Sequence, residues 1–214
     1  MTAGAGVPEA GGSAVVSWPT GVSGTGGASG TGGVSGTGLA DDEALHDLIR
    51  SRIRDVPGYP QPGVTFKDIT PLLADAAAFA AVVAGLAAGH EGVAKVAGIE
   101  ARGFILAAPA ACVLGAGFIP VRKQGKLPGP SYARTYALEY GTATIEVHQD
   151  AFRPGDRVLI VDDVLATGGT AAATVDLVRR CGAEVAEVAV LLELGFLNGR
   201  DALPGIPVRA LLTV

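Results

Sequence analysis

Two adjacent carboxylates, Asp162 and Asp163, stand directly ahead of a loop of small residues that is suited to bind an anion. The stretch reads VLIVDDVLATGGTAAA over residues 158–173, which predicts an apolar strand over 158–161, a loop, and then a helix. Glycines let the backbone approach a ligand closely, and successive N–H groups at a helix start can surround one phosphate. We expect Thr170 to cap the helix. The residues predicted to hold the phosphate are Ala166, Thr167, Gly168, Gly169 and Thr170.

The two carboxylates repel phosphate, so they must serve another part of the ligand. No lysine follows Gly169, so the nucleotide-binding GxxxxGK[ST] motif is absent and a monophosphate fits better than a triphosphate. A ribose 5′-phosphate explains both features, because carboxylates accept hydrogen bonds from vicinal hydroxyls. They also stabilise positive charge that develops on a sugar ring in an oxocarbenium-like transition state. The alternative interpretation is an ordinary helix start with two solvated aspartates.

The elements around this motif alternate between strand and helix, and the strands lack alternating polarity. That pattern predicts an α/β fold with a doubly wound, mostly parallel sheet and helices on both faces. Ligands in such sheets bind beyond the carboxyl ends of the strands, where the motif lies. Residues 132–148 alternate like two antiparallel strands that meet at 139–141. The other predicted strands are 93–99, 118–122, 158–161, 185–192 and 208–214, and the predicted helices are 41–56, 75–90, 104–114 and 170–180.

Composition divides the 214-residue chain into two parts. Residues 1–38 repeat a hexad of the form VSGTGG and carry one charged side chain, Glu9, so they cannot bury enough surface to order themselves. We expect a disordered Gly/Ser/Thr-rich tail over 1–38 and one globular domain over 39–214.

Charge and hydropathy exclude several functions. With 16 basic and 21 acidic residues, the chain lacks the footprint of a nucleic-acid binder. Residues 103–121 carry no charge, but Gly115 and Pro120 divide them into a helix and a strand rather than a membrane span. The N-terminus lacks the pattern of a signal peptide, and Cys112 and Cys181 are interpreted as buried, reduced thiols. We therefore expect a cytoplasmic protein.

The motif VLIVDDVLATGGT resembles the 5-phosphoribosyl-1-pyrophosphate (PRPP) motif of the type I phosphoribosyltransferases. The segments PGVTFKDITPLL, GIEARGF, VRKQGKLPGP and YALEYG follow in the order of the adenine phosphoribosyltransferase family, and the resemblance covers residues 45–214. It implies the type I fold with a small N-terminal hood and a flexible catalytic loop. It also implies transfer of the phosphoribosyl group from PRPP to adenine, giving AMP and pyrophosphate. Mg²⁺ would be held mainly by substrate oxygens and water.

The same resemblance implies roles for charged residues near the sugar. Asp162 and Asp163 would bind the ribose and stabilise its transition-state charge. The GIEARGF turn would bind pyrophosphate through backbone N–H groups, although Ala101 stands where the family commonly has serine. The VRKQGK cluster is either a solvated charge run or a pyrophosphate site, partly of the neighbouring subunit in a homodimer. The cations implied to serve pyrophosphate are Arg102, Arg122, Lys123 and Lys126.

The resemblance also implies how the base is held. Phe66 would stack on the purine, Thr65 and Lys67 would offer mainly backbone contacts, and Val164 would line the same site. The family often has valine and arginine where this chain has Thr65 and Lys67, changes that backbone recognition tolerates.

Glu139, in the segment YALEYG, is implied to handle a proton at purine N7 from a loop that closes over the site. Members that act on 6-oxopurines commonly have an aspartate at the position of Ala166, and alanine cannot accept a proton.

Two alternatives remain open. The first is another phosphoribosyltransferase of this fold, acting on a 6-oxopurine or on orotate. A non-catalytic PRPP- or nucleotide-sensing regulator is the second, but such a regulator would usually need a DNA-binding segment, and the tail has neither basic charge nor a recognition helix.

Overall fold

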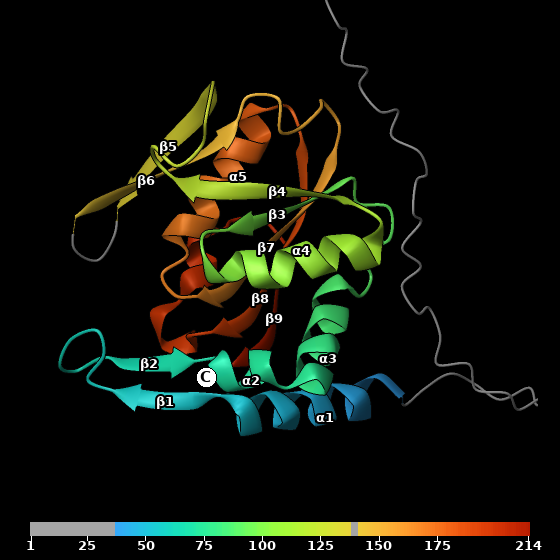
Figure 1. The fold of residues 1–214 in the computed structure, drawn as a ribbon, viewed down its shortest axis with the longest axis vertical. Helices are drawn as coiled ribbons and strands as arrows, with labels where there is room; N and C mark the ends of the chain where they lie inside the picture. Colours follow the sequence, from blue (N-terminus) through green and yellow to red (C-terminus); the bar gives the residue numbers. More distant parts are fainter. Residues whose placement is uncertain (1–36, 138–140) are drawn as a thin grey trace, which may run out of the picture. The chain divides into compact units, whose positions relative to one another are not determined.

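The computed structural model describes residues 37–137 and 141–214, with side chains from Glu43 onward. The predicted tail therefore lies almost wholly outside the described residues. A sheet runs through the described part in the order β5-β6-β4-β3-β7-β8-β9 (Figure 1). β3, β4, β7, β8 and β9 pair in parallel, and β5 and β6 form an antiparallel hairpin at one edge. The strands are β3 (Lys95–Ile99), β4 (Gly117–Lys123), β5 (Ser131–Ala137), β6 (Thr142–His148), β7 (Arg157–Leu165), β8 (Glu184–Glu193) and β9 (Val208–Thr213).

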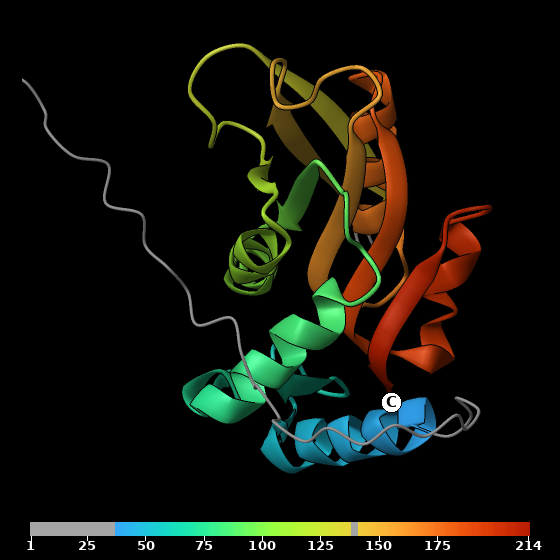
Figure 2. The same ribbon diagram turned by 90° about the vertical axis from the view of Figure 1, so that its right-hand side faces the viewer.

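Helices cover both faces of this sheet, as the strand pattern predicts. One face is buried by α1 (Thr37–Arg52), α3 (Ala76–Ala87) and α4 (Arg102–Leu114), and the other by α5 (Gly169–Arg180). Figure 2 shows α4 and α5 on opposite sides of the strands. Each face has its own apolar core, because the central strands have buried side chains on both sides. The doubly wound α/β fold is confirmed.

The N-terminal region corrects the prediction of one helix over residues 41–56. α1 ends at Arg52, and Arg54–Pro57 forms strand β1, which pairs antiparallel with β2 (Thr65–Asp68). Pairing with β2 overrides the helical pattern, since ladder contacts such as Val56 opposite Phe66 are non-local and invisible to a sequence window. This hairpin is followed by the short helix α2 (Thr70–Ala74) and forms the small N-terminal hood.

Two local predictions at the motif are also wrong. β7 does not end at Val161 but continues to Leu165, because its ladder with β8 extends to Leu165 opposite Glu193. The aspartates therefore lie within a strand, and not in a loop. Gly168, with a φ of 80°, precedes the first helical residue of α5, and no side chain caps this end, so Thr170 is not the cap.

The uncharged segment 103–121 forms most of α4 and β4, as predicted; the break between them falls at Gly115, whereas Pro120 lies within β4. Among the residues that the structure describes, no helix is long and apolar enough to cross a membrane. Both cysteines are free, but Cys112 is exposed on α4 and Cys181 is only half-buried, so the expected burial of these thiols is wrong.

Candidate active site

The paired aspartates lie side by side in β7 but have different surroundings. Asp163 is buried, and its Oδ2 lies 2.7 Å from Nη2 of Arg102. The two atoms form an ion pair without hydrogen-bond geometry, so this buried oxygen lacks a hydrogen-bond donor among the described residues. Asp162 Oδ1 accepts a hydrogen bond from the N–H of Asp163 at 2.8 Å. The two carboxylates thus lie together beside the Arg102 guanidinium.

Burial raises the pKa of the Asp162 carboxyl well above its ordinary value, and the adjacent charge of Asp163 raises it further. The N–H of Asp163 and the charge of Arg102 act in the opposite direction but do not compensate. Ionisation of both carboxyls is therefore unfavourable without a ligand. Hydroxyl donors or a positive charge supplied by a ligand would relieve that cost.

This arrangement predicts that Asp162→Asn stabilises the folded protein without ligand. The pKa of Asp162 is raised on folding, so its penalty is absent below the ordinary value near 3.8 and grows as pH rises above it. At pH 7 the variant should gain on the order of 1 kcal/mol, or a few degrees in Tm, because asparagine keeps the acceptor and removes the charge. Thermal unfolding at pH 7 and pH 4 measures this, and the gain should shrink at pH 4.

The matched control is Asp176→Asn, which alters an aspartate on α5 that is half-exposed and pairs with Arg134. It should leave Tm unchanged or slightly lower, as is usual for surface ion pairs. A loss of stability in Asp162→Asn at pH 7 would contradict the account of the acid pair.

The loop after β7 encloses a hollow of about 70 Å³ that is lined by Asp162 and by residues 164–171. Its shape depends on close backbone approach. A Cβ added to Gly168 would overlap the backbone oxygen of Gly199, and a Cβ added to Gly199 would overlap that of Ala166. The N–H groups of the first turn of α5 have no partners within the helix. The hollow can therefore hold one phosphate group at the positive end of α5.

An ion pair between the half-exposed Arg200 and the buried Glu193 supports this loop. The two guanidinium nitrogens Nε and Nη2 of Arg200 each donate to one oxygen of Glu193 at 2.8 Å. These hydrogen bonds lower the pKa of Glu193 although its burial opposes the shift. Arg200 belongs to the turn η2 (Gly199–Ala202), whose first residue touches Ala166, so the pair anchors the element on which the loop rests.

Arg102 connects the acid pair to the N-terminal hairpin. Besides its ion pair with Asp163, its guanidinium carbon lies 4.8 Å from the centre of the Phe66 ring, and Nη1 donates weakly to the Lys67 carbonyl at 3.5 Å. Gly103 lets the start of α4 lie close to β7, because a Cβ at Gly103 would come within 2.9 Å of Asp162 Oδ1. The peptide bond between Glu100 and Ala101 is cis.

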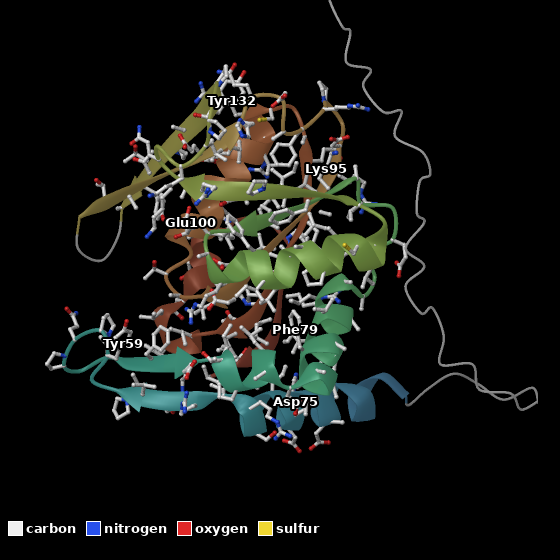
Figure 3. All side chains as sticks on the ribbon, viewed as in Figure 1. Tyr59, Asp75, Phe79, Lys95, Glu100 and Tyr132 are labelled. Atoms are coloured by element: carbon white, nitrogen blue, oxygen red, sulfur yellow. The ribbon has the colours of Figure 1, made fainter. Side chains whose placement is uncertain are left out.

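Ion pairs and hydrogen bonds fix the side chains of the β1–β2 hairpin. Nζ of Lys67 lies 2.8 Å from Asp55, across the β1–β2 ladder. Hydrogen bonds from Thr70 and Arg54 lower the pKa of Asp68 to about 2. Tyr59, which Figure 3 labels in the connection between the strands, meets Phe66 edge-on at 5.2 Å. Phe66 is half-buried, and so it keeps accessible ring surface beside Arg102.

The cationic segment at the end of β4 is held by two acids, the partly buried Glu100 and the buried Glu146, that the sequence interpretation missed. Glu100 follows β3, at the end opposite Lys95 in Figure 3, and its Oε2 accepts hydrogen bonds from Nε of Arg122 and from the N–H of Lys123. Burial alone would raise the pKa of Glu100, but these two donors outweigh it and lower that pKa. Arg122 is thereby fixed, whereas the side chain of Lys123 is exposed.

Glu146 organises the next part of this segment. It is 5 % exposed, and its oxygens accept from the N–H groups of Lys126 and Leu127 and from the Ser131 hydroxyl. Arg122 also donates to the Lys126 carbonyl at 3.2 Å. The backbone of Lys126 is therefore held from two sides while its side chain stays exposed. An acid within the apolar run ATIEVH is the signal by which Glu146 was recognisable.

The structure brings together only part of the set expected from the sequence. Asp163, Arg102 and Phe66 form one chain of contacts, and the loop hollow lies beside Asp162. Glu139 lies outside the described residues. Among the pocket-lining residues, Thr167 is exposed and Val164 is half-buried.

Comparison with known proteins identifies the family of this chain. A phosphoribosyl transferase domain matches residues 68–201. An adenine phosphoribosyltransferase from a Nocardioides species is 66 % identical over 168 residues, which cover 76 % of this chain and 91 % of that protein. The chain belongs to the adenine phosphoribosyltransferase family. The match includes β7, the loop hollow and the cationic segment.

Solved structures of the family agree with the fold. The adenine phosphoribosyltransferase of Rhodothermus marinus is 50 % identical, with a TM-score of 0.77, and the alignment covers 80 % of this chain and 99 % of that one. The Saccharomyces cerevisiae adenine phosphoribosyltransferase, crystallised with adenine and an imino-altritol bisphosphate, is 35 % identical with a TM-score of 0.75 over 79 % of this chain and 99 % of its own.

Proposed function

We propose that this chain transfers the 5-phosphoribosyl group of PRPP to N9 of adenine, giving AMP and pyrophosphate, with the residue roles that follow. The observation that carries the proposal is the contact chain from Asp163 through Arg102 to Phe66 beside a hollow sized for one phosphate. The membership of the adenine phosphoribosyltransferase family supports the reaction itself. The yeast relative that was crystallised with adenine supports the choice of base.

The sugar phosphate would occupy the carboxyl end of β7. Residues 166–170 hold the 5′-phosphate, and Asp162 and Asp163 accept from the ribose hydroxyls. As the bond to pyrophosphate lengthens, positive charge grows on the ring and the two carboxylates oppose it. Because burial and Asp163 raise the pKa of Asp162, positive charge on the ring would stabilise the ionised form of the pair.

The leaving pyrophosphate would lie near Arg102 and Lys126, together with Arg122 and Lys123 of the neighbouring subunit. Support comes from the network of Glu100 and Glu146, which fixes the backbone and Arg122 while the lysine side chains stay exposed. No group of three or more potential metal ligands occurs among the described residues. Two carboxylates plus substrate oxygens and water are a donor set that suits Mg²⁺. When bound, Mg²⁺ would neutralise charge on the pyrophosphate.

Adenine would stack on Phe66, with backbone groups of Thr65 and Lys67 and the side chain of Val164 around it. The Lys67 ammonium is already paired with Asp55, which leaves the backbone as the recognising group. Ala166 has no group that exchanges a proton with N7, so Glu139 is the residue to which the family resemblance assigns that proton.

We further propose a homodimer in which Arg122 and Lys123 approach the neighbouring site. Support comes from an exposed apolar stripe on α4, where Ile105 is 43 % and Val113 is 64 % exposed and Cys112 lies between them. Isolated apolar residues are common on surfaces, but a stripe along one helix next to β4 suits an interface. A cytoplasmic location is part of the same proposal, supported by two free thiols.

The proposal predicts a strong preference for adenine over other bases. A site that hydrogen-bonds an exocyclic amino group leaves polar groups unpaired when a carbonyl replaces it, so kcat/KM for adenine should exceed that for hypoxanthine by at least about 10³. Initial rates with adenine, hypoxanthine, guanine and orotate at fixed PRPP measure the ratio. Comparable rates with hypoxanthine or orotate would assign the chain to another base.

A further inference from the structure

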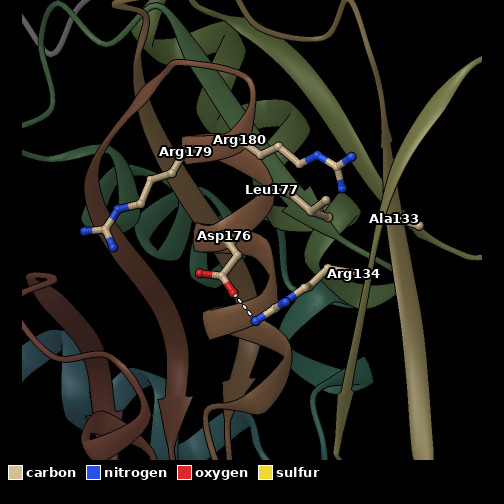
Figure 4. A pocket seen from close by; sticks show the side chains of 6 residues that line it. All are labelled: Ala133, Arg134, Asp176, Leu177, Arg179 and Arg180. Carbon is tan, nitrogen blue, oxygen red and sulfur yellow. Dashed lines mark ion pairs between the residues drawn. The ribbon is translucent and has the colours of Figure 1, made fainter.

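Strand β5 lies along helix α5 and is tied to it near both ends. Near one end, the guanidinium of Arg180 lies 4.4 Å from the centre of the Tyr132 ring. At mid-strand, Nη2 of Arg134 lies 2.8 Å from Oδ2 of Asp176 (Figure 4). These contacts border a cavity of about 390 Å³, and of its four charged lining residues only Arg134 and Asp176 pair with each other.

The other end of β5 meets the phosphate loop. A Cβ added to Gly169 would come within 3.2 Å of the Ala137 carbonyl oxygen and 3.3 Å of the Tyr136 ring. Next to this contact, the Thr170 hydroxyl donates a hydrogen bond to the Tyr136 hydroxyl, with 3.0 Å between the two oxygens. Because Thr170 does not cap α5, this bond to Tyr136 is what orients its side chain.

A hydrogen bond between two hydroxyls can reverse its direction. A phenol and an alcohol each donate one proton and accept through two lone pairs. When the Thr170 hydroxyl donates its hydrogen bond to a phosphate oxygen, the Tyr136 hydroxyl can rotate and donate a hydrogen bond to Thr170. The result is a chain from phenol to alcohol to phosphate, and such chains strengthen each bond by polarisation. Thr170 lines the hollow of the phosphate loop, so it is placed for this exchange.

We propose that Tyr136 is a positioning residue for the 5′-phosphate site, acting through Thr170. It orients the Thr170 side chain and donates a hydrogen bond to the Thr170 hydroxyl when that hydroxyl donates to the phosphate. The inference rests on the proposed function, because the phosphate in question is that of PRPP or AMP. It assigns to Tyr136 no contact with the base or with pyrophosphate.

Tyr136→Phe removes the hydroxyl and keeps the ring that packs against Gly169. The KM for PRPP and the dissociation constant for ribose 5-phosphate should rise about three- to tenfold, the effect of one such hydrogen bond. The KM for adenine and kcat should change less than about twofold. Equilibrium titration with ribose 5-phosphate gives the binding constant without turnover. Tyr132→Phe is the matched control, since it removes a hydroxyl from the same strand and face, and it should leave all these constants unchanged.

A double-mutant cycle separates this role from a structural one. Thr170→Val should weaken ribose 5-phosphate binding by itself, and adding Tyr136→Phe to it should cause no further loss, because the chain is already broken. Additive losses, equal effects of Tyr132→Phe, or unchanged binding in Tyr136→Phe would each overturn the inference. A wild-type protein that forms no AMP but shows the cycle would refute the proposed function alone. Normal AMP formation with no effect of Tyr136→Phe would refute only the inference.

Discussion

Replacing Asp162 and Asp163 together by asparagine should lower kcat by about 10³, a scale typical of lost transition-state charge stabilisation. Asparagine keeps an acceptor for the ribose hydroxyls but cannot oppose the charge that grows on the ring. The dissociation constant of PRPP should change by less than about tenfold. Single-turnover rates at saturating PRPP, combined with equilibrium binding, separate the two quantities.

The single variants and one distant variant serve as controls for this change. The decreases in kcat caused by Asp162→Asn and Asp163→Asn alone should not multiply to the decrease in the double variant, because adjacent carboxylates in one site act as a unit. Asp176→Asn, on α5 and paired with Arg134, should leave turnover intact. If PRPP binding collapsed while bound substrate still reacted at the normal rate, the electrostatic role of the pair would be wrong.

Changing Glu139 to glutamine should reduce adenine turnover by about 10² or more, the usual scale for a general acid or base. The amide keeps the size of the side chain but cannot exchange a proton with N7, and Ala166 offers no substitute. The dissociation constant of PRPP should stay nearly unchanged. Steady-state kcat in the forward direction and PRPP titration provide the two numbers.

Glu91→Gln is a suitable control for Glu139→Gln, because it makes the same chemical change at an exposed position in the turn after α3. Its activity should equal that of the wild type. A Glu139→Gln protein with unimpaired turnover would remove the proton-handling role and leave the base specificity without its present explanation.

Features set by local pattern could be predicted from the sequence. The apolar run before Asp162 and the paired glycines Gly168 and Gly169 marked both the central strand and the phosphate loop. Gly115, which ends α4, correctly divided the uncharged stretch into a helix and a strand, whereas Pro120 lies within β4. These are short-range signals, in which backbone freedom and side-chain period act within a few residues.

Features set by non-local partners could not be read in the same way. Strand Arg54–Pro57 exists because β2 pairs with it, and β7 continues to Leu165 because β8 lies beside it. The hydrogen bond from Thr170 to Tyr136 joins residues 34 positions apart, so a capping rule for Thr170 alone could not predict it. Glu146 is similar, since its partners Lys126 and Leu127 come from a loop that the sequence pattern leaves undefined.

The central claim is that this chain joins adenine to the sugar of PRPP. The most direct measurement is product formation by the purified wild-type chain from labelled adenine, PRPP and Mg²⁺, with AMP and pyrophosphate quantified together. The account predicts AMP and pyrophosphate in equal amounts, and no AMP when ribose 5-phosphate replaces PRPP, because that compound has no leaving pyrophosphate. Absence of AMP, or AMP without matching pyrophosphate, would contradict it.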